Sequence, residues 1–133
     1  MAPTSHCYFD FPQAKGSAEP ESIGGFLPLD TVYSFEPVPA ALAESQRRHI
    51  LGGQGNLWGE FFWNGKDVEY FAFPRALALA EALWSPAEGR SLASFLSRLD
   101  GQLAQLDRMQ VNYRKPDAKK PTSRATQSKA ETK

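Results

Sequence analysis

The chain has 133 residues, of which 41% are apolar and 23% charged, and its formal net charge at neutral pH is zero. This length allows one domain with a sizeable core. A single cysteine excludes an internal disulfide framework, and no cysteine–histidine cluster has metal-ligand spacing, so we expect neither a metal nor another cofactor. We find no signal-peptide pattern and no apolar stretch long enough to cross a membrane.

The balanced charge hides a basic tail. Residues 114–133 hold seven basic and two acidic side chains, so the tail carries +5 and the preceding residues −5. Its proline, serine, threonine, lysine and alanine content predicts disorder. We do not expect nucleic-acid binding, because no aromatic residue follows Tyr113 to stack on bases and the rest of the chain is acidic.

The first expected strand covers Ser5 to Phe9, because the opening residues MAPTSHCYFD alternate imperfectly in polarity and end in an aromatic residue and a carboxylate. At strand spacing, Tyr8 and Asp10 point to the same face. Phe11-Pro12 ends this strand, because proline cannot donate to a ladder.

The next stretch, residues 13–39, is rich in glycine, proline and serine. We expect a long surface loop there, with at most one short helix near Leu29 to Tyr33. A loop of this length indicates a functional role or a missing partner surface. A short helix, Ala40 to Arg47, is expected to follow.

The segment His49 to Trp63, HILGGQGNLWGEFFW, predicts a second, buried strand that opens with Ile50 and Leu51. Its three glycines indicate a bulge or the close approach of another group. Trp58 and Glu60 lie two apart, and an indole beside a carboxylate suits a sugar ring, whose C–H face stacks while its hydroxyls donate. The alternative for this pair alone is a core tryptophan and a glutamate that faces water.

Helices follow the second strand. After a turn at residues 64–67, the pattern predicts a helix from Val68 to Trp84, with Pro74 early in it. A second helix, capped by Ser91, is strongly amphipathic and structural. Its apolar positions recur at threes and fours: Leu92, Phe95, Leu96, Leu99, Leu103, Leu106 and Met109.

The order of strand, loop with helix, strand, helix and helix indicates an α/β fold with parallel strands joined by a crossover. Two strands do not make a stable parallel sheet, because such sheets need cover on both faces. Only Met1 to Thr4 precede the first expected strand, so no capping element lies before it. We therefore interpret the chain as part of something larger.

Four blocks together resemble the C-terminal quarter of the catalytic domain of family 20 glycoside hydrolases, the β-N-acetylhexosaminidases: SHCYFDFP, GGFLPLDTVYSFEPVP, HILGGQGNLWGEFFW and VEYFAFPRALALAEALWSP. The resemblance covers residues 1–113 and leaves the basic tail, 114–133, outside. It implies a fragment of a (β/α)8 barrel, comprising about the last two strands and helices, followed by the amphipathic helix. The strand at Ser5 to Asp10 would be the seventh and that at Ile50 to Glu60 the eighth.

The resemblance also implies roles for four residues in hydrolysing terminal β-linked N-acetylglucosamine or N-acetylgalactosamine. In this family the substrate's own acetamido oxygen attacks the anomeric carbon, which is an exception to the two-carboxylate scheme. Tyr8 would be the catalytic tyrosine that steadies the oxazolinium intermediate. Asp10 would accept from a sugar hydroxyl such as O6, Trp58 would lie under the pyranose ring, and Glu60 would accept from O4.

The sequence departs from the family because several site groups are absent: the general acid, the arginine that holds the sugar hydroxyls and two more pocket tryptophans. The general acid of the family is a glutamate directly after an aspartate, and no Asp-Glu dipeptide occurs in this chain. We therefore expect the chain alone to be inactive and to need the N-terminal portion of the barrel. The alternative is a non-catalytic remnant, or an interaction module that completes a partner chain. Localisation is not predicted, although an exported, periplasmic or lysosomal full-length relative is plausible.

The sequence singles out four further residues. Cys7 neighbours Tyr8 but points to the opposite face, and we expect a buried, inert thiol. Trp63 and Trp84 are expected in the core. Arg75 follows Pro74 in the resembling block, and its role, in packing or in function, stays open.

Overall fold

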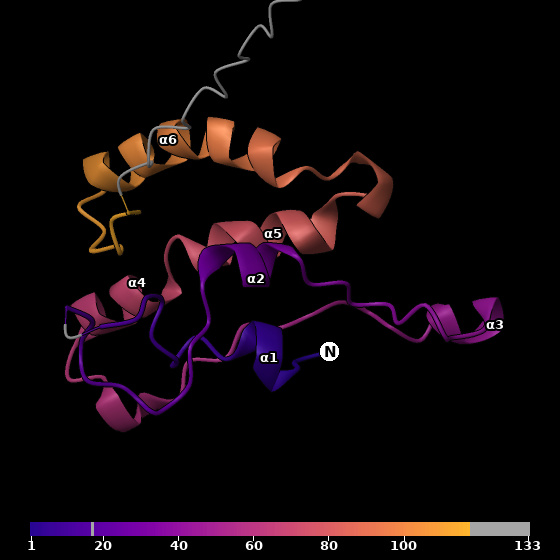
Figure 1. Cartoon of the computed structure of the whole chain (residues 1–133), viewed down its shortest axis with the longest axis horizontal. Coiled ribbons are helices and arrows are strands. Elements are labelled where there is room, and N and C mark those ends of the chain that lie inside the picture. The colour runs from indigo at the N-terminus through magenta and orange to yellow at the C-terminus, as the bar shows by residue number, and fades with distance from the viewer. Residues whose placement is uncertain (17, 118–133) are drawn as a thin grey trace, which may run out of the picture.

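The computed structural model describes residues 1–16 and 18–117, in which the regular secondary structure is helical and is joined by long irregular segments (Figure 1). Helix α6 forms a layer over α5, and α2 lies against α5. The described residues form six α-helices and two 3₁₀ turns: α1 (Thr4–Cys7), α2 (Leu29–Tyr33), α3 (Glu44–Arg47), η1 (Gly59–Phe61), α4 (Gly65–Ala72), α5 (Arg75–Trp84), η2 (Ala87–Gly89) and α6 (Leu92–Arg108).

Neither predicted strand forms in the described part of the chain. The expected strand at Ser5 to Phe9 is largely helix α1, and the expected strand at Ile50 to Glu60 is extended chain that ends in η1. What remains of the parallel pairing is one bridge, between Tyr8 and Asn56. A strand is stabilised by ladders on its neighbours, and these two segments offer each other too few paired positions.

The two segments nevertheless run side by side in a parallel sense. The Met1 ammonium donates to the Gly52 carbonyl (2.8 Å), and the Met1 carbonyl accepts from the Gln54 amide (3.0 Å). Further on, Tyr8 pairs with Asn56. The first segment has more residues between these two contacts than the second, and its surplus residues wind into α1.

The single helix predicted from Val68 to Trp84 is two helices, α4 and α5, separated at the cis Phe73-Pro74 peptide bond. A residue before proline is disfavoured in the helical region, and Phe73 is extended (φ −107°, ψ 143°). The expected turn at residues 64–67 is instead the start of α4. There, the Asn64 side chain accepts from the amides of Lys66 and Asp67, and the Asp67 carboxylate accepts from the Asn64 amide.

The other helices match the predictions to different degrees. Helix α2 has the predicted bounds, whereas α3 covers only the second half of the predicted Ala40 to Arg47 helix, because Ala43 is still extended. Helix α6 starts after Ser91, whose hydroxyl accepts from the Ser94 amide (3.4 Å).

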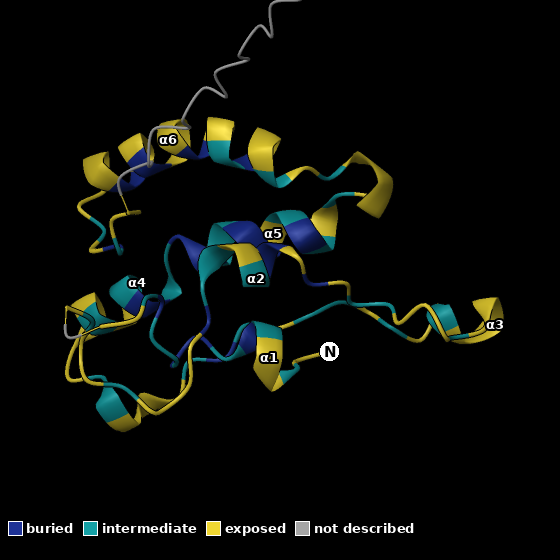
Figure 2. Ribbon diagram, in the orientation of Figure 1, coloured by how far each residue is buried: buried dark blue, intermediate teal, exposed yellow. Residues whose placement is uncertain are grey.

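The core forms where α6 covers α2 and α5, and Figure 2 shows the buried side of α6 turned toward α5. The Phe95 ring of α6 stacks on the Tyr33 ring of α2, with centroids 4.9 Å apart. The predicted apolar stripe of α6 accounts for all four of its buried residues: Phe95, Leu99, Leu103 and Leu106. Met109, also predicted in the stripe, is 63% exposed.

Several apolar side chains are exposed where the sequence predicts burial. Leu51 is 97% exposed, Trp63 84% and Trp84 89%, so the prediction of core positions for them is wrong. Leu51 belongs to residues 36–55, which contain no buried residue and run out to α3 at one side of the molecule. In the described chain, no element packs over these three side chains closely enough to bury them.

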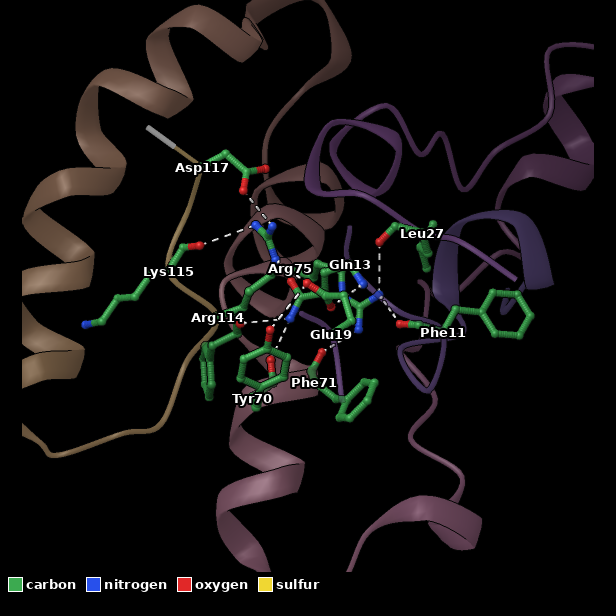
Figure 3. Close-up of polar contacts among 11 residues, drawn as sticks. Phe11, Gln13, Glu19, Leu27, Tyr70, Phe71, Arg75, Arg114, Lys115 and Asp117 are labelled. Carbon is green, nitrogen blue, oxygen red and sulfur yellow. Dashed lines mark hydrogen bonds and ion pairs between the residues drawn. The ribbon is translucent and has the colours of Figure 1, made fainter. Parts of the chain in front are cut away.

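A polar cluster ties the long loop to the end of the described chain (Figure 3). The Glu19 carboxylate accepts from Arg114 Nε (2.8 Å), the Gln13 amide (3.0 Å) and the Tyr70 hydroxyl (3.3 Å). Arg114 also pairs with Asp117 (2.8 Å). Residues 114–117 of the predicted tail are thus held by ion pairs, and 118–133 lie outside the described residues.

Candidate functional site

Two aromatic rings from the paired segments meet at the centre of the candidate site. The rings of Tyr8 and Trp58 have centroids 6.3 Å apart and are inclined by 51°. Their proximity follows from the register, because the Phe9 amide donates to the Asn56 carbonyl and the Asn56 amide to the Cys7 carbonyl, each at 2.7 Å. The parallel pairing that the sequence predicts is therefore present at one position, between Tyr8 and Asn56, next to the two rings.

Asp10 brings a buried carboxylate to the same place. It is 4% exposed, and its Oδ1 atom has no hydrogen-bond partner in the described chain. Burial raises the pKa of Asp10, the charge of Glu60 raises it further, and its own backbone amide and the Arg75 guanidinium lower it. A buried carboxylate oxygen without a donor is costly, and a hydroxyl group of a bound molecule would satisfy it.

Glu60 lies in a different backbone conformation from the one expected. It lies in η1 rather than at the end of a strand, and it is exposed, as is Trp58, at 51%. Its charge nevertheless acts on Asp10. The structure thus brings Tyr8, Asp10, Trp58 and Glu60 into one neighbourhood, with one carboxylate buried and the other open to solvent.

The sequence did not single out Phe11, which supports the Tyr8 ring. Their ring centroids are 6.0 Å apart. Phe11 in turn lies against Gly25, where a Cβ atom would meet the Phe11 ring at 2.8 Å and where φ is +120°. Only glycine adopts that backbone readily, and the Gly24-Gly25 pair was the available sequence signal.

Two of the three glycines before Trp58, Gly53 and Gly55, are approached closely by other groups, as the sequence predicts, whereas a Cβ atom on Gly52 would meet nothing within 4 Å. A Cβ atom on Gly53 would meet Leu83 and Phe35 at 2.9 Å, and one on Gly55 would meet the Phe9 ring at 2.9 Å. Gly52 has a φ of +148°. Residues 54–58 line a hollow of about 180 Å³ beside the Trp58 ring.

Arg75, whose role the sequence left open, is completely buried at the start of α5. Burial lowers its pKa to about 9, against the opposing charges of Glu19 and Asp10, so the guanidinium remains charged at neutral pH. Figure 3 shows it surrounded by carbonyl groups of distant segments. Cys7, the residue before Tyr8, is buried as expected, and burial raises the pKa of its thiol.

The described residues contain no group of three or more histidine, cysteine, aspartate or glutamate side chains that could hold a metal ion. No helix among them is both long and apolar enough to cross a membrane.

Comparison with known proteins places these features in a family context. The model of the glycosyl hydrolase family 20 catalytic domain matches residues 1–87. The β-hexosaminidase of Porphyromonas gingivalis is 39% identical over 114 residues, which are 86% of this chain and 15% of that protein. The β-hexosaminidase of Akkermansia muciniphila is 34% identical over 102 residues, 74% of this chain and 20% of that protein.

A solved structure agrees. The family 20 exo-β-N-acetylglucosaminidase of Vibrio harveyi, in complex with N-acetylglucosamine, superposes with a TM-score of 0.75 at 38% identity, over 88% of this chain and 19% of that one. This chain therefore spans a fifth or less of these relatives. The structural match fits part of a (β/α)8 barrel, as the resemblance implied.

Proposed function

Because this chain belongs to glycosyl hydrolase family 20, we propose that it supplies one side of the sugar pocket of a β-N-acetylhexosaminidase. The substrate would be a glycan with a terminal β-linked N-acetylglucosamine or N-acetylgalactosamine at its non-reducing end. The observation that carries the proposal is the contact of Tyr8 with Trp58 beside the buried, unpartnered oxygen of Asp10.

The two rings would act on different parts of the sugar. Trp58, half exposed, offers its face to the C–H side of the pyranose. The Tyr8 hydroxyl would donate to the acetamido carbonyl as that oxygen attacks the anomeric carbon and the glycosidic bond breaks. A donor aimed at charge that develops in the transition state contributes about 3 kcal/mol.

The two carboxylates would fix the orientation of the ring. Asp10 would accept from O6, which gives its buried Oδ1 the donor it lacks in the described chain. Glu60, exposed on η1, would accept from O4. A site that hydrogen-bonds these two hydroxyl groups rejects sugars that lack them.

The reaction needs groups that this sequence does not hold. The general acid that protonates the leaving oxygen corresponds to an Asp-Glu pair, which is absent from the chain. Water would then open the oxazolinium ring and give the product with retained configuration. We infer that the chain alone does not hydrolyse glycosides, and that it acts with the barrel portion that precedes it in its relatives.

An apolar surface supports the need for such a portion. A hollow of about 320 Å³ along α5 is lined mainly by apolar side chains, among them Leu57, Ala76, Leu83 and Trp84. Trp84 is 89% exposed, and patches of this kind mark surfaces that another element covers. The same surface favours the second candidate function, an interaction module that completes a partner chain without catalysis.

A chimera tests the proposal and separates the two candidates. Residues 1–117 would replace the matching segment of the Vibrio harveyi enzyme, and release of 4-nitrophenol from its N-acetyl-β-glucosaminide would be measured. We expect activity in the chimera, about 100-fold lower kcat for Tyr8→Phe, and a raised KM for Trp58→Ala. A folded chimera without activity would leave only the non-catalytic candidate.

Matched controls guard against loss of folding. Tyr113→Phe removes a tyrosine hydroxyl that bonds Asp107 rather than lying in the site, and Trp63→Ala removes an exposed indole outside it. Both should keep the activity of the parent chimera. Should Tyr8→Phe behave like Tyr113→Phe, the role of Tyr8 would be refuted even in an active chimera.

A further inference from the structure

One buried guanidinium connects three separate segments of the chain. Arg75 Nη1 donates to the carbonyls of Phe11 (2.9 Å) and Leu27 (3.0 Å), and Nη2 donates to those of Phe9 (2.5 Å) and Phe71 (2.6 Å). The acceptors belong to the site segment, the long loop and α4. The guanidinium carbon also lies 5.0 Å from the centre of the Phe9 ring.

Two of the four acceptors flank Asp10 in sequence. The Phe9 carbonyl belongs to the peptide bond between Phe9 and Asp10, and the Phe11 carbonyl belongs to the residue that follows Asp10. Because the guanidinium is planar and its donors have fixed directions, two bonds from one group fix the backbone on both sides of Asp10. The bond to the Phe9 carbonyl also fixes the backbone directly after Tyr8.

We propose that Arg75 is a positioning residue for the sugar pocket, which sets the directions of the Tyr8 and Asp10 side chains through the carbonyls of Phe9 and Phe11. The inference rests on the proposed function and names a residue that touches no substrate. A lysine cannot replace it, because an ammonium group has at most three donors and no fixed fork.

The charge of Arg75 acts in the same direction as its geometry. Burial and the charge of Glu60 favour the protonated form of Asp10, and Arg75 opposes them. An ionised carboxylate only accepts hydrogen bonds, as an acceptor for a sugar hydroxyl should, whereas a protonated carboxyl carries an O–H donor. Arg75 thus fixes the backbone on both sides of Asp10 and also opposes the rise in the pKa of its carboxyl.

Arg90 provides a matched control on the same chain. Its Nη1 donates to the carbonyls of Phe35 (3.0 Å) and Ala82 (3.1 Å), and its Nε, like that of Arg75, has no partner in the described residues. Neither acceptor adjoins a residue of the site. A general loss of packing would follow from either substitution, whereas loss of orientation in the site would follow from only one.

The experiment uses the full 133-residue chain labelled with ¹³C and ¹⁵N. Three-bond couplings report the χ1 rotamers of Tyr8 and Asp10 without any sugar, and a titration with N-acetylglucosamine gives its Kd. In Arg75→Lys we expect averaged χ1 couplings at both residues and a Kd about tenfold weaker, and in Arg90→Lys neither change. Unchanged couplings at both residues in Arg75→Lys would overturn the proposal.

Two further results remain distinguishable. If the wild-type chain shows ordered rotamers that Arg75→Lys loses, but no binding of the sugar, the positioning stands and the sugar-pocket assignment for the isolated chain fails. If Arg75→Lys does not fold, the proposal is tested by a measurement on the wild-type chain instead. Scalar couplings from the Arg75 Nη–H groups to the Phe9 and Phe11 carbonyl carbons support the proposal, and their absence refutes it.

Discussion

Removing the Glu19 carboxylate should destabilise the chain strongly, because this side chain ends three hydrogen bonds in a nearly closed environment. Its side chain is 7% exposed and that of its ion-pair partner Arg114 is 14% exposed. Losing one member of a buried pair costs about 3–5 kcal/mol. Asp117 still pairs with Arg114, but it is 85% exposed and compensates little, so we expect the lower figure, about 3 kcal/mol, for Glu19→Ala.

Urea unfolding followed by far-UV circular dichroism measures this loss. With an m-value of roughly 1.5 kcal/mol/M, the midpoint should fall by about 2 M at unchanged m. Glu44→Ala is the control, because Glu44 forms an ion pair with Arg47 at 3.5 Å but is 95% exposed, and it should cost less than about 0.5 kcal/mol. Equal losses in the two variants would refute the reasoning that burial gives the Glu19 pair its strength.

The remaining predictions use the same unfolding measurement. Gly25→Ala should cost at least about 2 kcal/mol, because of its positive φ and the Phe11 ring 2.8 Å from the new Cβ, whereas Gly24→Ala, with nothing within 4 Å, should change stability by less than about 0.5 kcal/mol. Asn64→Ala should cost about 1 kcal/mol, and a smaller loss than about 0.3 kcal/mol would show that its two amide contacts do not cap α4. Burial raises the pKa of Asp10 above 3.8, so the folded state holds the proton more tightly and stability falls as pH rises from 3.8 through the folded pKa. Asp10→Asn should flatten that part of the pH profile, and an unchanged profile would contradict it.

Helices were predictable where their signals are local. The bounds of α2 and the start of α6 at Ser91 follow from neighbouring residues. A capping residue and an apolar stripe can both be recognised within one or two turns of sequence. The break at Pro74 was also local, but the helix-forming residues on both sides outweighed it in the prediction. The constraint on Phe73 was the stronger signal.

The strands could not be predicted reliably, because a strand depends on partners that its own sequence does not contain. Alternation at Ser5 to Phe9 indicated an extended segment, yet the surplus residues relative to the 52–56 segment wind into α1. The proximity of Tyr8 and Trp58 was nevertheless expected, because it needs only a parallel register at one point, the Asn56 bridge.

The role of Arg75 lay beyond the sequence for a similar reason. Three of its four acceptors are 48 to 66 residues away along the chain. No local spacing identifies carbonyl groups as acceptors, since every residue has one. Only the arrangement of the folded chain shows which of them meet a guanidinium.

Cys7 gives the site a reporter of its own. It is the single cysteine of the sequence, has no exposed surface, and its carbonyl accepts the Asn56 hydrogen bond that sets the register of the two segments. A thiol reagent can reach it only after this pairing has opened. The rate of modification under native conditions therefore reports the opening of this pairing together with the part of the core in which Cys7 is buried.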